Sequence, residues 1–115
     1  MMRKAALFLL LFCQPVIAAA PISPHEALSN VGQHVIVEGK AYIHTSSYRF
    51  GTDIDLDRDG DDSVALGYIP KENLAGFPHL QRFDHRLVDL DGVVQLYHGR
   101  AEIKLTTADQ IRLVK

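Results

Sequence analysis

A two-residue alternation of apolar and polar side chains recurs along this chain and restricts the folds that it can adopt. In residues 34–44, for example, Val35, Val37 and Ile43 fall on one face and polar residues on the other. Successive side chains of a β-strand point to opposite faces, so this period is typical of strands that bury one side. The same period predicts four more strands, in residues 49–57, 63–70, 86–97 and 101–107.

Short connections join these predicted strands. Asp59-Gly60 and His98-Gly99 are typical of tight turns between antiparallel strands. Gly39, inside the first strand, indicates a bulge or a sharp bend. Residues 71–83 contain a glycine and a proline that limit them to a helical turn or a covering loop. Five strands with this one longer connection predict a small closed all-β structure with one or two short helices.

One of the short helices is predicted just before the first strand. Ser23 suits the N-cap, Pro24 the first helical position, and Glu26 completes a capping box. We expect this helix to end near Asn30. Within the third strand, Tyr68 is in phase with Val64 and Leu66, and we expect it to be buried.

The first residues are predicted to be a secretory signal peptide rather than part of the fold. Two basic residues precede an apolar run that is too short to span a bilayer, and small residues follow it. We expect cleavage after Ala18, with Ala20 as the alternative, since Pro21 disfavours the later cut. Acylation at Cys13 is disfavoured by the bulky Phe12 before it. The mature chain is then one domain, residues 19–115, located in the periplasm or secreted.

Removal of the signal changes the charge balance. Arg3 and Lys4 leave with it, so the mature chain has ten basic and 14 acidic side chains and a net charge of −4. Proteins that bind nucleic acid are usually basic on at least one face. Cys13 is the only cysteine, so no disulfide stabilises the mature domain.

Several motifs resemble those of exported bacterial OB-fold proteins. Val31-Gly32-Gln33, followed by Val35, Val37 and Gly39, is similar to the opening of the first strand in that family. The most specific match lies near the end of the chain, in Tyr97, Gly99, Glu102, Ile103, Gln110 and Ile111. The resemblance implies a five-stranded Greek-key OB-fold barrel that binds single-stranded nucleic acid or another extended ligand.

In such modules aromatic and basic side chains on the ligand face contact the nucleic acid. Carried over to this chain, the resemblance implies a contact set of two tyrosines and three basic residues. The set is Tyr48, Arg49, Tyr97, Arg100 and Lys104.

The acidic stretch from Asp53 to Asp62 has two interpretations. Asp55, Asp57 and Asp59-Gly60 fit the first half of a calcium loop, but the twelfth position is Leu66 instead of a glutamate. A weak calcium site at the hairpin tip remains open, with the ligands Asp59, Asp61 and Asp62.

The other interpretation is a solvated hairpin on which Asp53, Asp55 and Asp57 all point outward. Such a face would repel phosphate. It supports an alternative function, a protein-interaction or envelope-stress module that binds a basic partner.

Nothing in the sequence predicts an enzyme or a resident cofactor. The six histidines form no two-histidine helical metal motif, so we expect them to be scattered over the surface. Asp89 and Asp91 share the outward face of the fourth strand, and we expect both to face solvent.

Overall fold

The computed structural model describes residues 19–44 and 51–115; the predicted signal peptide, Tyr48 and Arg49 lie outside these ranges. One α-helix, α2 (Pro24–Ala27), continues as a 3₁₀ turn (Leu28–Asn30). Further 3₁₀ turns cover Gly60–Asp62, Lys71–Gly76, Leu80–Phe83 and Ala108–Gln110. The strands are β1 (His34–His44), β2 (Gly51–Leu56), β3 (Ala65–Pro70), β4 (Leu87–Tyr97), β5 (Arg100–Lys104) and β6 (Ile111–Leu113).

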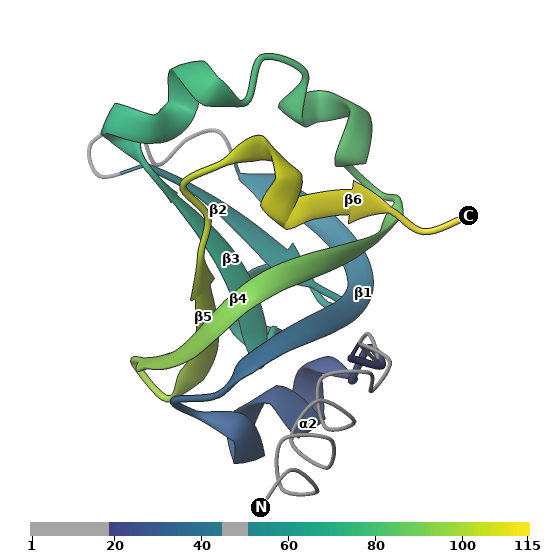
Figure 1. The fold of residues 1–115 in the computed structure, drawn as a ribbon, viewed down its shortest axis with the longest axis vertical. Coiled ribbons are helices and arrows are strands. Elements are labelled where there is room, and N and C mark those ends of the chain that lie inside the picture. The colour runs from purple at the N-terminus through teal and green to yellow at the C-terminus, as the bar shows by residue number, and fades with distance from the viewer. Residues whose placement is uncertain (1–18, 45–50) are drawn as a thin grey trace, which may run out of the picture.

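Five of these strands form a hydrogen-bonded ring in the order β1-β2-β3-β5-β4, which β1 and β4 close (Figure 1). All the pairs are antiparallel except β3 with β5, which run parallel. This is the topology of an OB-fold barrel, so the predicted fold class is confirmed. The sixth strand, β6, adds three residues to the free side of β4.

The ring closes because β1 pairs first with one strand and then with another. Its first part, His34 to Lys40, pairs with β4, and Ala41 to His44 pair with β2. At the changeover Gly39 is buried, and a Cβ there would lie 2.9 Å from Asp57 Oδ1 and 3.2 Å from Leu56 Cβ. The predicted bend at Gly39 therefore corresponds to the point where β1 changes its neighbour.

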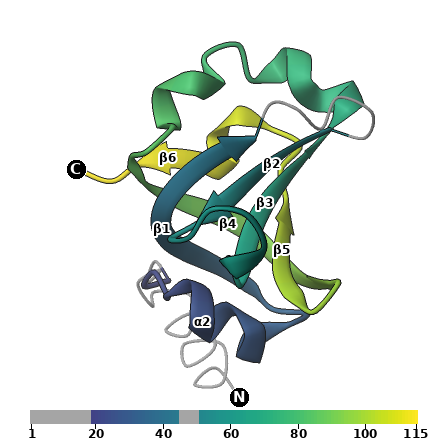
Figure 2. The ribbon, with the colours of Figure 1, turned by 180° about the vertical axis from the view of Figure 1, so that it is seen from behind.

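The barrel encloses one apolar core. Its members come from every strand of the ring, and Leu90 and Leu105 are completely buried. Phe77 and Phe83, from the segment 71–83, also belong to this core. That segment covers one end of the barrel, and α2 lies at the other (Figures 1 and 2).

The helix start is confirmed in detail. The Ser23 hydroxyl accepts a hydrogen bond from Glu26 N, and the Glu26 carboxylate accepts one from Ser23 N. These two bonds satisfy two of the amide donors that the helix leaves free at its start. Among the described residues no helix is long and apolar enough to cross a membrane.

The predicted burial of Tyr68 on β3 is wrong, although Leu66, which the prediction placed on the same face, is buried with 1% of its surface exposed. Ala65 and Ile69 belong to the core, whereas Tyr68 is only half-buried on the outer face. The reason is space: a Cβ on Gly67 would approach Leu90 Cδ1 to 2.9 Å. Because β3 passes close to Leu90 at Gly67, only a glycine fits on its inward side there, between Ala65 and Ile69.

Replacing Gly39 tests the strand changeover. We expect Gly39→Ala to lower the free energy of unfolding by about 1–3 kcal/mol, because the new methyl group must displace packed neighbours. The matched control is Gly76→Ala, where a Cβ meets nothing within 4 Å and the change should be within about 0.5 kcal/mol. Urea denaturation of both variants measures the difference, and equal stabilities would contradict the packing account.

Candidate ligand-binding face

The outer face of β2, β3 and β5 contains a hollow lined by two acids and two tyrosines. The strand register places Tyr68 opposite Asp53 on β2 and Leu66 opposite Glu102 on β5. Tyr97, at the end of β4, completes the lining of a hollow of about 290 Å³. All four side chains are held by barrel strands, so the hollow does not depend on a loop for its shape.

Both carboxyl groups in this hollow have a raised pKa. Burial raises the pKa of Asp53, and the nearby charge of Asp55 raises it further. Burial likewise raises the pKa of Glu102, with Asp53 as the second cause. Within residues 19–44 and 51–115, neither carboxylate has an ion-pair partner. The face therefore holds two like charges that a bound cation would stabilise.

Asp55 is the main correction to the predicted acidic hairpin. It does not point into solvent but is buried, with 3% of its surface exposed. Its Oδ2 accepts a hydrogen bond from Gly60 N at 2.7 Å, and Arg100 Nη1 donates to its Oδ1 at 3.4 Å. The turn after β2 folds back over the strand, so its backbone and Arg100 replace the water that we expected around this carboxylate.

Of the contact set implied by the resemblance, three members lie in the described residues. Tyr97 is 49% exposed and meets His98 edge to face. Lys104 is exposed on β5, in register with Tyr68. Arg100 is partly buried against Asp55 and also donates to the Gly60 carbonyl. One of the two described cations is therefore already paired, which leaves little positive charge on this face.

Two of the three predicted calcium ligands, Asp59 and Asp62, have side chains that the structure describes, and Asp62 is not a member of the cluster that contains Asp59. The side chain of Asp61 lies outside the description, so the predicted set of three stays a prediction. Asp57, the third position of the calcium-loop pattern, turns away from the tip: its Oδ1 accepts a hydrogen bond from Lys40 N at 2.9 Å. Asp59 instead approaches a histidine that the sequence did not single out, His44.

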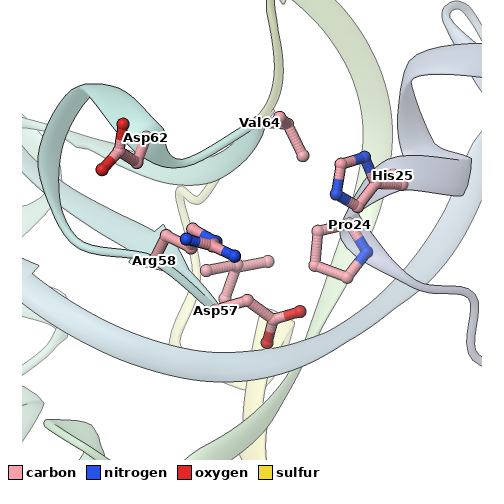
Figure 3. Close-up of a pocket in the computed structure, with 7 residues that line it drawn as sticks. Pro24, His25, Asp57, Arg58, Asp62 and Val64 are labelled. Carbon is pink, nitrogen blue, oxygen red and sulfur yellow. The ribbon is translucent and has the colours of Figure 1, made fainter.

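A second hollow, of about 730 Å³, lies between α2 and the β2–β3 connection. Figure 3 shows Pro24 and His25 on one side of it and Arg58 and Asp62 on the other. It contains charges of both signs. The Asp57 carboxylate in this hollow already accepts a hydrogen bond from the backbone of β1, so it has a structural role. The outer face of β2, β3 and β5 is therefore the better candidate for a ligand site.

Basic side chains gather elsewhere, beside β6. Four exposed residues from the segment before β4 and from the chain end line a hollow of about 470 Å³ together with apolar neighbours. No ion pair within the described ranges engages any of them. We call them the β6 basic groove: Arg82, Arg86, Arg112 and Lys115.

The two acids predicted to face solvent on β4 are both half-buried. Asp91 Oδ1 lies 2.5 Å from His34 Nε2. Asp89 stands between Glu38 and Arg112 in the register, and its Oδ1 is buried with no hydrogen-bond partner among the described residues. The neighbouring strands β1 and β6 cover this part of β4, which explains the lower exposure.

No family model matches the chain, and no curated protein matches it either. Among solved structures, it is similar to a crystal structure from Leishmania major Friedlin described as an aspartyl-tRNA synthetase, with a TM-score of 0.53 and 19% sequence identity. The match covers 100% of this chain and 26% of that protein, so the chain spans about a quarter of its length. At this identity the likeness supports the OB-like fold alone.

Neutralising Glu102 tests the electrostatics of the face. The carboxyl group is surrounded by Asp53, Tyr68 and Tyr97, with Arg100 and Lys104 as its cationic neighbours on β5. Its folded pKa is raised, so folding becomes less favourable as the pH rises from the ordinary glutamate pKa through the raised value.

We therefore expect Glu102→Gln to stabilise the protein at neutral pH by about 0.5 to 1 kcal/mol. The gain should shrink as the pH falls below the ordinary glutamate pKa. Thermal unfolding at several pH values measures both effects. A variant less stable than the parent at neutral pH would show that the carboxylate is stabilising.

Proposed function

We propose that this protein is an exported, non-enzymatic OB-fold module that binds an extended ligand across the outer face of β2, β3 and β5. The OB-fold topology supports the binding role, since proteins with this fold bind their ligands on that face and on the adjoining loops. Fold analogy alone does not select the ligand. The composition of residues 1–18 supports export.

The charge of the face favours a cationic ligand, such as a lysine- or arginine-bearing segment of an envelope protein. The observation that carries this choice is the hollow in which Asp53 and Glu102 lie between Tyr68 and Tyr97. An ammonium or guanidinium group there would neutralise both carboxylates and lie against the tyrosine rings. A charge-assisted hydrogen bond contributes about 1.5–3 kcal/mol, and an exposed cation–π contact about 0.5–1 kcal/mol.

Single-stranded nucleic acid is the second candidate, and the β6 basic groove is the observation that favours it. Four of the ten lysines and arginines that follow residue 18 line this groove. Their charges would suit phosphates, whereas Asp53 and Glu102 would repel them. If nucleic acid binds, its phosphates therefore contact β6 rather than the outer face of β2, β3 and β5.

Binding of a labelled oligolysine peptide tests the first candidate. The double variant Asp53→Asn, Glu102→Gln should bind it at least about tenfold more weakly, a loss of about 1.4 kcal/mol. The control Asp62→Asn removes one negative charge from the other hollow and should leave the affinity within about twofold. Fluorescence anisotropy at low salt measures all three proteins, and equal affinities would rule out the acidic hollow as the binding site.

Labelled oligothymidylate tests the second candidate. We expect weak binding that falls as salt rises and that is lost in the double variant Arg82→Gln, Arg112→Gln, because these changes remove two groove charges. The Asp53→Asn, Glu102→Gln protein should bind the oligonucleotide at least as well as the parent does. Tight binding of oligonucleotide combined with no binding of oligolysine would make nucleic acid the ligand.

A further inference from the structure

Three side chains from separate segments converge beside the ligand-binding face. His44 ends β1, Asp55 lies in β2, and Asp59 is in the connection that follows β2. One ligand atom from each lies within 4.8 Å of the other two. His44 Nε2 is 3.0 Å from Asp55 Oδ2 and 2.5 Å from Asp59 Oδ1.

The nitrogen of His44 is the informative atom. Nε2 is buried, and despite the two nearby oxygens it has no hydrogen-bond partner among the described residues. Its contacts with the two aspartate oxygens are close, but they lack the geometry of a hydrogen bond. A buried nitrogen left without a partner is costly unless a further group binds it.

The carboxylate of Asp55 is held in place for such a role. Its side chain is 4% exposed, Gly60 N donates to Oδ2, and Arg100 occupies the other oxygen, Oδ1. Hydrogen bonds of this kind orient metal-binding carboxylates in proteins. Asp55 thus presents one oxygen to the cluster while its charge is partly balanced from behind.

We propose that His44, Asp55 and Asp59 bind a divalent transition-metal ion of the zinc type. Imidazole nitrogen with carboxylate oxygen suits such ions, whereas calcium prefers oxygen ligands alone. Bonds of about 2.0–2.1 Å in a tetrahedral site place ligand atoms about 3.4 Å apart. Both distances from His44 Nε2, 3.0 Å to Asp55 Oδ2 and 2.5 Å to Asp59 Oδ1, would therefore lengthen when the ion binds. Three protein ligands leave the fourth position for water or for an exogenous group.

This site is independent of the proposed function. It uses neither Glu102 nor Tyr97, and it differs from the calcium set at the hairpin tip by two of three ligands. A metal here would join the end of β1 to the β2–β3 connection.

Zinc titration of the tag-free protein, followed by calorimetry and by thermal unfolding, tests the proposal. We expect zinc to raise the Tm of the parent by several degrees with one binding equivalent. The variants His44→Gln and Asp59→Asn should each weaken zinc binding at least tenfold and remove the shift in Tm. Two control variants, His98→Gln and Asp62→Asn, change an exposed histidine and an exposed aspartate and should bind zinc like the parent.

Replacing zinc by cobalt gives a readout that fold stability does not affect. The parent should show the visible absorption of a nitrogen- and oxygen-ligated cobalt ion, and His44→Gln should lose it while remaining folded by circular dichroism. No Tm shift with zinc, or equal zinc affinity in His44→Gln, would overturn the proposal and leave a protonated His44 paired with two carboxylates. Calcium binding that survives His44→Gln would overturn it in favour of an acidic site.

Discussion

The barrel depends on β1 pairing with two strands in succession. Its early residues hydrogen-bond to β4 and its last residues to β2, so a single strand closes the ring. Gly39 permits the changeover because Leu56 and Asp57 pack where its side chain would be. Asp57 then secures the junction: its carboxylate and its backbone N–H both bond to Lys40. An acid that looked like part of a ligand set in the sequence has a structural role here.

Closure also determines what the outer face presents. The parallel pairing of β3 with β5 brings Glu102 near Asp53, although the two are far apart in the sequence. The result is a pair of desolvated carboxylates between tyrosines, on the face where OB-fold proteins bind their ligands. Desolvated like charges are unfavourable for folding, and groups with shifted pKa values gather at functional sites. This unfavourable arrangement is the physical reason for proposing a cationic ligand.

The sequence predicted the elements better than their contacts. Alternation located the five strands of the ring, and the Ser23 capping box located the helix, because both signals are local. The burial of Tyr68 was predicted wrongly because the bulky Leu66 and Tyr68 gave a stronger apolar signal than Ala65 and Gly67, which face the core. The burial of Asp55 and its contact with Arg100 depend on a strand pairing that no local pattern contains. His44 was missed for the same reason, since it is eleven residues from Asp55 and belongs to no spacing motif.

The central claim is that the outer face of β2, β3 and β5 binds cations and that phosphate, if bound, lies beside β6. Amide chemical-shift mapping during titration with oligolysine tests it most directly, because it reports the location of binding as well as its strength. The account predicts that the shifts concentrate on Asp53, Tyr68 and Glu102 and leave Arg82 and Arg112 unchanged. Shifts centred on β6, or no shifts on β2, β3 and β5 at saturating peptide, would contradict it.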